Sequence, residues 1–490
     1  MGAAPVIAPS GFREYDLRWR FPEEIDLAGM AAVGRGLGTQ LLRRGGDRRI
    51  VAGHDLRSYS PAVHAALVSG LAAAGCDVHD IGLAVTPMAY FARAHLGIGA
   101  VAMVTASHNP NGWTGVKAGF TAPFTHGPAD IAELRDIVLG QAAVTAAGGR
   151  VTRCHGLREP FIDACAGGFR ARRRLRVVCA TGNGTAGLFA PLLLERLGAE
   201  VVPLHTEPDT RFPHYNPNPE ALEMLQDMAR AVRAAGADLA LGFDGDGDRL
   251  GVVDDRGEAL FADKLGVLLA RGIARGRPGS LFLADVKSTG LFATDPVLAA
   301  LGGRVEYVRV GHSHVKRLLA ARGAAAAFEK SGHIYLAPPL GRGYDCALSA
   351  ATLVLRMLDE AGDAPLSALA ATLPGTFLSP TMCPHCPDGE KYAAADRIAA
   401  RLQALFREGG TLGGRRILGV TETNGARVAL EGGGWALVRA SSNTPNLVVV
   451  CESPESRDHL AAIFADVDAL IRCEPSVGAY DQGLEGPQTT

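Results

Sequence analysis

The chain has 490 residues, of which 47% are apolar and 20% are charged, so it can bury several cores and should divide into about three or four domains. Its 49 basic and 51 acidic residues nearly cancel, which argues against a nucleic-acid-binding protein, because such proteins gain affinity from a basic face. No apolar stretch approaches the roughly 20 residues of a membrane span, and the N-terminus lacks a secretory pattern. With nine scattered cysteines, we expect a cytoplasmic protein with reduced thiols.

Hydrophobic periodicity predicts the order strand, helix, strand, helix, strand in three successive segments. In the first segment these elements fall at 49–55, 61–74, 77–81, 87–95 and 99–104. In the second they fall at 175–180, 188–197, 200–204, 219–235 and 237–243, and in the third at 280–286, 291–301, 304–310, 312–322 and 324–328. Such alternation predicts sheets with helices on both faces, in which ligands gather beyond the carboxyl ends of the strands. After about residue 367 the pattern becomes a mixture of helices and strands with glycine-marked turns.

The first segment ends in a polar turn that offers a nucleophilic oxygen. The string Thr105-Ala-Ser-His-Asn-Pro110 follows the strand at 99–104, so Ser107 lies near the carboxyl end of that strand. A serine hydroxyl at such a place can carry a phosphoryl group, but serine is also common in turns before Asn-Pro. The string alone leaves both interpretations open.

The second segment ends in an acidic loop, Asp244-Gly-Asp-Gly-Asp-Arg249. Three carboxylates that alternate with glycine can turn inward together, and such hard oxygen ligands suit Mg²⁺ or Ca²⁺. An EF-hand is disfavoured, because the sixth residue is Arg249 instead of glycine and strands flank the loop. A solvated acidic turn is the other alternative. A phosphorylated Ser107 would supply a fourth oxygen, with Arg249 as the guanidinium partner of its phosphate.

The third segment also ends in a chemically useful residue, because Glu329 directly follows the strand at 324–328. Further on, Cys383-Pro-His-Cys386 resembles half of a zinc or redox site. A structural zinc site needs four ligands, and no second cysteine pair with suitable spacing follows. We therefore expect no metal or redox function at these cysteines.

Four strings occur in order, one in each predicted domain: Thr105–Pro110, Asp244–Arg249, Phe328-Glu-Lys-Ser-Gly-His333 and Arg439-Ala-Ser-Ser-Asn-Thr444. They closely resemble the phosphoserine, metal, sugar-binding and phosphate-binding loops of the α-D-phosphohexomutases. Supporting matches lie at 12–18, 113–117, 285–287, 311–316 and 477–482. Within that family, the start and the end of the chain most resemble the bacterial phosphomannomutase/phosphoglucomutase branch.

The resemblance implies an α/β fold of three similar mixed-sheet α/β domains and a smaller C-terminal α+β domain, heart-shaped around a central cleft. We expect the domains at 1–153, 154–256, 257–367 and 368–490, carrying the phosphoserine, metal, sugar-binding and phosphate-binding loops in that order. Mg²⁺ is the implied cofactor, and a hexose 1,6-bisphosphate is the implied activator and intermediate. We expect sugar phosphates as partners, no nucleic acid or membrane, and a monomer or weak dimer.

The resemblance also implies roles for individual residues. The expected metal ligands are Ser107, Asp244, Asp246 and Asp248, with Ser107 carrying the phosphoryl group. His108 and Arg249 would belong to the catalytic group, and either Lys117 or His312 would move the proton. The residues expected to bind the sugar or line the cleft are Tyr15, Arg18, Lys287, Glu329, Ser331 and His333. Those expected to hold the non-reacting phosphate are Arg439, Ser441, Ser442, Asn443 and Thr444.

The implied activity is that of an intramolecular phosphotransferase, which interconverts hexose 1-phosphates and 6-phosphates of mannose and/or glucose for nucleotide-sugar and polysaccharide synthesis. Two alternatives stay open: the same chemistry on N-acetylglucosamine phosphate, and a sugar-phosphate binding protein without turnover. The sequence departs from the family at Lys330, where mannose- and glucose-type members usually have Met. The doubled serine in the last loop leaves the register at Ser442 and Asn443 open.

Overall fold

The computed structural model describes residues 5–441 and 444–484, and the chain divides into two compact units. Unit 1 is formed by Met1–Ala262, Gly311–Ala321 and Ser331–Ser367, and unit 2 by Asp263–Val310, Arg322–Lys330 and Ala368–Thr490. Each unit contains both helices and strands. Among the described residues, no helix is both long enough and apolar enough to cross a membrane.

The first sheet of unit 1 has six strands in the order β1-β5-β4-β2-β3-β6. Their bounds are β1 Leu17–Arg20, β2 Arg49–His54, β3 Asp77–Leu83, β4 Ala100–Val104, β5 Trp113–Gly119 and β6 Arg150–Arg153. The helices of this part are α1 Leu27–Arg43, α2 Ser60–Ala73, α3 Thr86–Leu96 and α4 Pro128–Leu139. Strands β2, β3, β4 and β6 run parallel, whereas β5 pairs antiparallel with β4, and β1 pairs antiparallel with β5. The sheet is therefore mixed.

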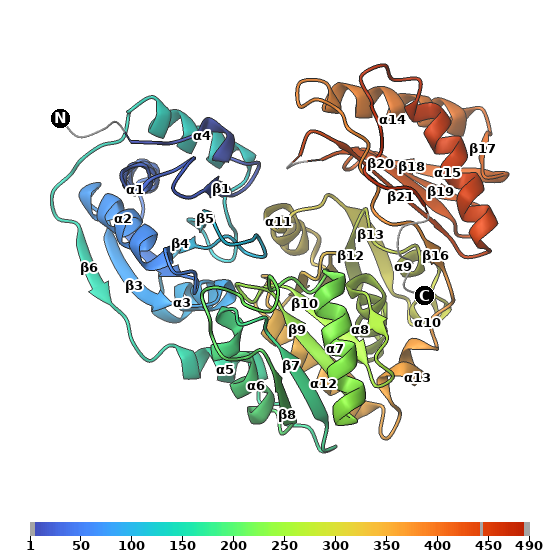
Figure 1. Cartoon of the computed structure of the whole chain (residues 1–490), viewed down its shortest axis with the longest axis horizontal. Coiled ribbons are helices and arrows are strands. Elements are labelled where there is room, and N and C mark those ends of the chain that lie inside the picture. Colours follow the sequence, from blue (N-terminus) through green and yellow to red (C-terminus); the bar gives the residue numbers. More distant parts are fainter. Residues whose placement is uncertain (1–4, 442–443, 485–490) are drawn as a thin grey trace. The chain divides into compact units, whose positions relative to one another are not determined.

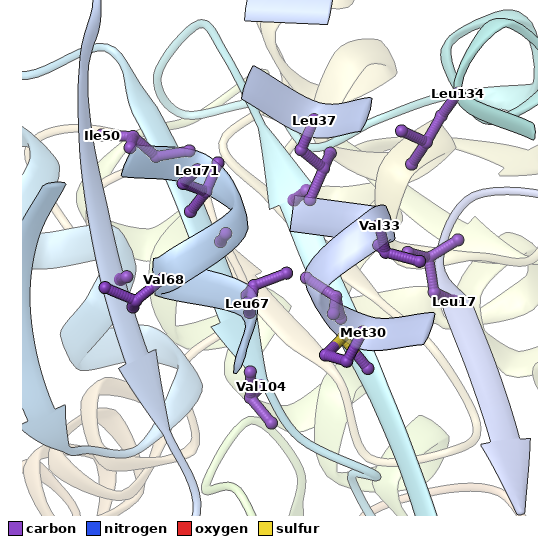
Figure 2. Close-up of a cluster of buried hydrophobic side chains, with 14 of the residues drawn as sticks. Leu17, Met30, Val33, Leu37, Ile50, Leu67, Val68, Leu71, Val104 and Leu134 are labelled. Atoms are coloured by element: carbon purple, nitrogen blue, oxygen red, sulfur yellow. The ribbon is translucent and has the colours of Figure 1, made fainter. Parts of the chain in front are cut away.

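Helices α1 and α2 pack closely because glycine lies where they touch. A Cβ on Gly34 of α1 would lie 2.2 Å from the carbonyl oxygen of Leu67, and a Cβ on Gly70 of α2 would lie 2.1 Å from that of Ala31. Figure 2 shows Leu67 beside Met30, both in the buried apolar cluster that the helices form with the sheet. This core holds the strands from which the functional loops emerge.

The second sheet of unit 1 has the order β11-β10-β9-β7-β8. Its strands are β7 Arg176–Ala180, β8 Glu200–Leu204, β9 Leu239–Phe243, β10 Leu250–Asp254 and β11 Ala259–Leu260, and the nearby helices are α5 Arg158–Ala166, α6 Ala190–Arg196 and α7 Leu222–Ala235. Unit 1 also contains most of α11 His312–Arg322, together with β15 Ile334–Leu336 and α12 Ala347–Glu360. The repeat of parallel strands β8, β7 and β9 matches the prediction for this segment.

Unit 2 contains the parallel strands β12 Leu281–Asp285, β13 Arg304–Val308 and β14 Ala326–Phe328, with β12 between the other two. Its helices here are α8 Ala262–Gly276, α9 Leu291–Thr294 and α10 Pro296–Ala300. An antiparallel sheet follows in the order β16-β21-β20-β19-β18-β17, with bounds Phe377–Leu378, Leu447–Ser453, Trp435–Ala440, Ala426–Leu430, Arg415–Thr421 and Thr411–Leu412. Short helix α13 Leu366–Ala370 precedes this sheet, and α14 Lys391–Arg407 and α15 Arg457–Ile471 pack against it (Figure 1).

Two of the predicted helices were wrong in extent. The helix predicted at 291–301 is two short helices, because Asp295 is extended (φ −67°, ψ 117°) and caps the second helix at Leu298 N–H. Pro296 begins that second helix and cannot donate a backbone hydrogen bond back into the first. The helix predicted at 219–235 begins only at Leu222. Neither difference changes the position at which a neighbouring predicted strand ends.

A buried polar cluster in unit 2 joins the loop after β12 to the antiparallel sheet. Glu452 of β21 accepts hydrogen bonds from Thr289 Oγ1 (2.8 Å), the Gly290 N–H (2.6 Å) and the indole N–H of Trp435. The guanidinium of Arg427 stacks on Trp435, with 3.6 Å to the ring centroid, and donates to two backbone carbonyls of the same loop. This cluster fixes the loop that begins at Val286.

We expect Glu452→Ala to destabilise unit 2 by about 3 kcal/mol, because it leaves three buried donors unpaired and removes a charge near Arg427. The thermal unfolding transition, followed by circular dichroism, should move to a lower temperature. The matched control is Glu455→Ala, since Glu455 pairs with the exposed Arg415 and its loss should cost less than about 0.5 kcal/mol. Equal shifts for the two variants would contradict this account of the cluster.

Candidate active site

The ends of β4 and β9 bring the predicted nucleophile to the acidic loop within unit 1. Ser107 lies three residues beyond β4, and Asp244 directly follows β9. The Ser107 hydroxyl oxygen is 3.3 Å from Asp244 Oδ2 and is almost fully buried. Ser107 has a φ of 54°, a left-handed conformation that a non-glycine residue adopts only when its surroundings hold it there.

The three carboxylates of the acidic loop form one cluster, as predicted. Asp244, Asp246 and Asp248 are fully buried, and each offers one oxygen within 4.8 Å of the others. Gly247, at φ 75°, allows the chain to turn so sharply. Burial raises the pKa of Asp244 well above its usual range, and the neighbouring Asp246 and Asp248 raise it further. Such a concentration of negative charge is unfavourable without cations.

Lys117 supplies one of these cations. Its ammonium donates to Asp246 Oδ2 at 2.8 Å and also to Asp248 Oδ2. Burial opposes the charge on Lys117, but the two carboxylates hold its pKa well above the usual range. In return, Lys117 lowers the pKa of Asp246 despite the burial of that carboxylate. Lys117 therefore stays charged and compensates part of the cluster.

The remaining carboxylate oxygens fit a metal ion. Asp246 Oδ1 and Asp248 Oδ1 are buried, and neither has a hydrogen-bond partner among the residues that the structure describes. Buried acceptors without donors are costly, and hard carboxylate oxygens are the ligands that Mg²⁺ and Ca²⁺ prefer. The donor set and the two unpaired oxygens together support a metal cofactor at this cluster.

Arg249 extends from the same loop and lies beside His333. Its Nε is 3.1 Å from His333 Nε2 and 4.0 Å from Asp244 Oδ2, and its Nη1 pairs with Glu220 at 3.1 Å. Burial opposes its charge, but Glu220 and the acidic cluster raise the pKa of Arg249. The guanidinium is therefore a fixed positive charge at the edge of the cluster.

His333 links this site to a second ion pair. Its Nδ1 is 3.1 Å from Asp345 and 3.6 Å from Asp248, and Asp345 also pairs with Lys316 at 2.7 Å. Burial would raise the pKa of Asp345, but Lys316 and His333 hold it well below the usual range. The sequence drew attention to His333 but not to Lys316 or Asp345. Lys316 and Asp345 are recognised only in the folded structure, where the lysine and the carboxylate are buried as a pair.

His312 lies at the start of α11 and packs against Tyr15. Its ring centroid is 4.9 Å from that of Tyr15, and its Nδ1 is 3.3 Å from Thr125 Oγ1. Burial, and then the nearby Lys316, lower the pKa of His312 well below its usual range, so its imidazole is neutral at neutral pH. The structure thus places two predicted residues together, His312 and Tyr15.

His108 belongs to the predicted phosphoserine loop at 105–110, and Arg18 contacts the same loop. His108 Nδ1 is 3.3 Å from the Ser107 hydroxyl, and Arg18 donates to the carbonyl of Thr105 at 2.5 Å. Burial lowers the pKa of His108, and Arg249 and Arg18 lower it further. Ser331 lies next to Gly332, whose carbonyl accepts the backbone N–H of Leu250, one residue after the acidic loop.

In unit 2, the predicted sugar-binding loop also lies at a strand end. Glu329 follows β14, and Asp285 ends the neighbouring parallel strand β12. The Asp285 carboxylate accepts the backbone N–H of Lys287 at 2.9 Å and that of Lys330 at 3.2 Å. This single carboxylate therefore ties the Lys287 loop to the Glu329 loop.

The predicted phosphate-binding loop follows β20. Arg439 is in β20 and is mostly buried, and the Ser441 hydroxyl is 2.8 Å from that of Thr444. Ser442 and Asn443 lie outside the described residues. Lys391, which the sequence analysis missed, donates to the Thr444 carbonyl at 3.0 Å. It begins α14, far from any recognised string, so no local signal marked it.

Comparison with known families agrees with this geometry along nearly the whole chain. Residues 9–143, 159–257 and 261–377 match, in order, the alpha/beta/alpha domains I, II and III of phosphoglucomutase/phosphomannomutase, and residues 385–470 match its C-terminal domain. The chain belongs to the phosphoglucomutase/phosphomannomutase family. The fold predicted from the sequence, three α/β domains and a C-terminal domain, is thereby confirmed.

Individual relatives of this family span almost the full length of the chain. A phosphomannomutase/phosphoglucomutase of Pseudomonas putida is 33% identical over 481 residues, covering 96% of this chain and 98% of its own. A protein of Methanothermobacter thermautotrophicus with the name probable phosphoglucosamine mutase is 32% identical and covers 91% and 94%. The crystal structure of a phosphoglucomutase/phosphomannomutase family protein from Burkholderia thailandensis has a TM-score of 0.86 at 29% identity, covering 96% and 99%.

A buried ion pair that the sequence analysis missed fixes the loop that carries Ser107. Arg57 pairs with Asp55 and donates to the carbonyls of Ser107 (2.9 Å) and Asn109 (2.5 Å). Asp55 accepts from Thr105 Oγ1 at 3.0 Å, and Thr105 Oγ1 accepts the Ser107 N–H at 2.8 Å. Asp55 and Arg57 follow β2 directly, so the rule that strand ends carry the chemistry could have found them.

We expect Arg57→Lys to lower kcat about 100-fold and to change KM less, because a displacement of about 1 Å at a reacting group costs that much. Lysine keeps the positive charge, but it lacks the second nitrogen that lets Arg57 pair with Asp55 through Nη1 and donate to both carbonyls through Nη2. Steady-state kinetics measure the effect, and Arg49→Lys, at an exposed pair with Asp47, is the matched control. A kcat equal to that of the control would mean that Arg57 does not position Ser107.

Proposed function

We propose that Ser107 carries the phosphoryl group that this phosphohexomutase moves between the 1- and 6-hydroxyls of a hexose. Members of the family interconvert hexose 1-phosphates and hexose 6-phosphates, and the chain contains all four of its domains. The observation that carries the assignment is the Ser107 hydroxyl 3.3 Å from the buried acidic cluster. A serine at that place can accept a phosphoryl group, return it to either end of the sugar and leave a bound 1,6-bisphosphate in between.

The cluster would hold Mg²⁺ through Asp244, Asp246 and Asp248, with Ser107 as the fourth oxygen ligand. When bound, the cation neutralises charge on the phosphoryl group as it moves. Arg249 adds a second positive charge at the edge of the cluster, which suits a phosphate oxygen. Lys117 holds Asp246 and Asp248 in place, and Arg57 holds the backbone of the Ser107 loop.

The sugar hydroxyls would bind to a carboxylate and a hydroxyl, because the first only accepts hydrogen bonds and the second both donates and accepts. The proposed sugar-binding and cleft residues are Tyr15, Arg18, Lys287, Glu329, Ser331 and His333. The proposed phosphate-binding residues are Arg439, Ser441, Ser442, Asn443 and Thr444. Asp285 and Lys391 support these two sets by fixing the loops that carry them.

Two residues remain candidates for moving the proton of the reacting hydroxyl, Lys117 and His312. The His312 Nε2 is buried and has no hydrogen-bond partner among the described residues, so a neutral imidazole could accept a proton there. Lys117 is committed to two carboxylates in the same structure. His108, 3.3 Å from the Ser107 hydroxyl, would orient that hydroxyl.

Mannose and glucose phosphates are the proposed substrates, and a cytoplasmic monomer or weak dimer is the proposed state. The test is a turnover assay with Mg²⁺ and a trace of glucose 1,6-bisphosphate, offering mannose 1-phosphate, glucose 1-phosphate and N-acetylglucosamine 1-phosphate in parallel. Conversion of the first two to 6-phosphates is expected. A clear preference for N-acetylglucosamine 1-phosphate would change the proposed substrate and would make Lys330 the residue to explain. Binding of the sugar phosphates without conversion of any of them would contradict the proposed mutase activity.

A further inference from the structure

Unit 1 contains a cavity of about 700 Å³ that uses none of the residues proposed above for catalysis or binding. Its lining residues come mainly from helices α3, α5 and α12 and from the segment between β15 and α12. The lining residues that matter here are Tyr90, Phe161, Cys165, Tyr344, Cys346 and Ser349. The space is lined mostly by aliphatic and small residues, together with the rings of Tyr90, Phe161 and Tyr344 and the two thiols.

The two thiols face each other across this space. Cys165 lies in the last turn of α5 and Cys346 precedes α12, and their sulfur atoms are 3.8 Å apart although the residues are 181 positions apart in sequence. Both side chains are mostly buried, but both line the cavity, so a small molecule inside it reaches them. A disulfide needs a sulfur–sulfur distance of about 2.05 Å, so the two sulfur atoms must approach by less than about 2 Å.

The two sulfur atoms differ chemically. Cys346 is the N-cap of α12, where its sulfur accepts the Ser349 N–H at 3.4 Å, and helix N-termini favour thiolates. Burial opposes ionisation of Cys346, but the hydrogen bonds from Cys165 and Ser349 lower its pKa. Burial raises the pKa of Cys165 well above its usual range. Cys346 is thus the nucleophile of the pair, and Cys165 is the thiol that resolves its oxidised form.

We propose that Cys165 and Cys346 form a reversible disulfide when a small peroxide enters this cavity. The Cys346 thiolate attacks one peroxide oxygen, the O–O bond breaks, and a sulfenic acid forms together with one water, which takes up the proton that Cys346 had lost. The Cys165 sulfur then attacks the Cys346 sulfur, the S–O bond breaks, and the hydroxyl leaves as a second water after taking the Cys165 proton. Two thiols are oxidised by two electrons, and one hydrogen peroxide is reduced to two waters.

The disulfide would affect the acidic cluster through the segment that carries Cys346. Its neighbour Asp345 pairs with Lys316 at 2.7 Å and lies 3.1 Å from His333. The backbone N–H on the other side, at Ala347, donates to the carbonyl of Gly247 in the acidic loop at 3.2 Å. A displacement of Cys346 would therefore move both Asp345, which contacts Lys316 and His333, and Ala347, which contacts the acidic loop. This consequence, unlike the disulfide itself, rests on the proposed function.

The test treats the full-length protein with hydrogen peroxide and maps its peptides without reduction. The expected result is a peptide pair joined through Cys165 and Cys346, with turnover about tenfold lower and restored by dithiothreitol. In Cys165→Ser, peroxide should produce neither the cross-link nor the loss of turnover. In Cys473→Ser, which replaces an exposed thiol, peroxide should produce the cross-link and the loss of turnover as in the wild type. Oxidation of Cys473 without the cross-link would overturn the proposal.

Two further outcomes separate this proposal from the proposed function. A cross-link with unchanged turnover would overturn the coupling to the acidic cluster. Because peptide mapping needs no substrate, a protein that converts no sugar phosphate still reports whether the disulfide forms. If Cys165→Ser fails to fold, the peptide map of the oxidised wild-type protein alone decides whether Cys165 and Cys346 form the disulfide.

Discussion

Replacement of Ser107 by alanine is expected to reduce turnover of hexose phosphates by at least about 10⁴-fold, which is the scale of losing a covalent nucleophile. The hydroxyl is the atom that would form the phosphoryl bond, and the acidic cluster cannot substitute for it. The framework around it should survive, because Arg57 and Thr105 bond to the backbone of residue 107 and not to its side chain. The loss should therefore appear in kcat with the thermal unfolding temperature little changed.

Mass spectrometry of the intact protein adds a readout that does not depend on turnover. Incubation with glucose 1,6-bisphosphate should add one phosphoryl group to the wild type and none to Ser107→Ala. The exposed Ser10 provides the control variant Ser10→Ala, which should take up phosphate and turn over normally. Phosphorylation of Ser107→Ala to the wild-type extent would place the phosphoryl group on another residue and would contradict the proposed mechanism.

The sequence predicted those parts of the fold that follow from local periodicity. The strands that end before Ser107, Asp244 and Glu329 were all predicted, because a buried parallel strand is a short apolar run bounded by turn residues. Ligands of open α/β sheets gather beyond the carboxyl ends of such strands, and this rule marks the same three residues as candidates for chemistry. Local pattern and one rule of topology therefore marked the places of Ser107 and the acidic loop, whereas their roles were predicted from the family resemblance.

What the sequence could not predict are partnerships between distant residues. Lys117 was a candidate for proton transfer, but its two ion pairs join residues more than 100 positions apart. Likewise, the position of Arg57 after a strand and of Lys316 in a supporting string did not reveal their partners, since a buried cation is recognised by the carboxylate or carbonyl that it meets in the folded chain. Lys391 carries no local pattern at all. The broken helix at Asp295 was visible in the Asp-Pro pair, but apolar periodicity outweighed it.

Replacement of Asp246 by asparagine is expected to weaken Mg²⁺ binding about 100-fold and to lower turnover about 1000-fold at limiting Mg²⁺, because the proposed metal ligand loses its charge. Asparagine has nearly the same shape, so the hydrogen bond from Thr86 Oγ1 (2.6 Å) can be kept while the charge opposite Lys117 is lost. Isothermal titration with Mg²⁺ and the Mg²⁺ dependence of turnover measure the two effects separately.

The matched control for this prediction is Thr86→Val, which removes a hydrogen bond to the same carboxylate oxygen but leaves its charge. A buried hydrogen bond contributes about 1 kcal/mol, so this variant should change the Mg²⁺ requirement by no more than about fivefold. If Asp246→Asn behaved like Thr86→Val, the carboxylate would serve only to hold Lys117 and Thr86. The Oδ1 atoms of Asp246 and Asp248 argue otherwise, because neither accepts a hydrogen bond from the described residues, and a buried carboxylate oxygen without a donor is costly unless a cation meets it.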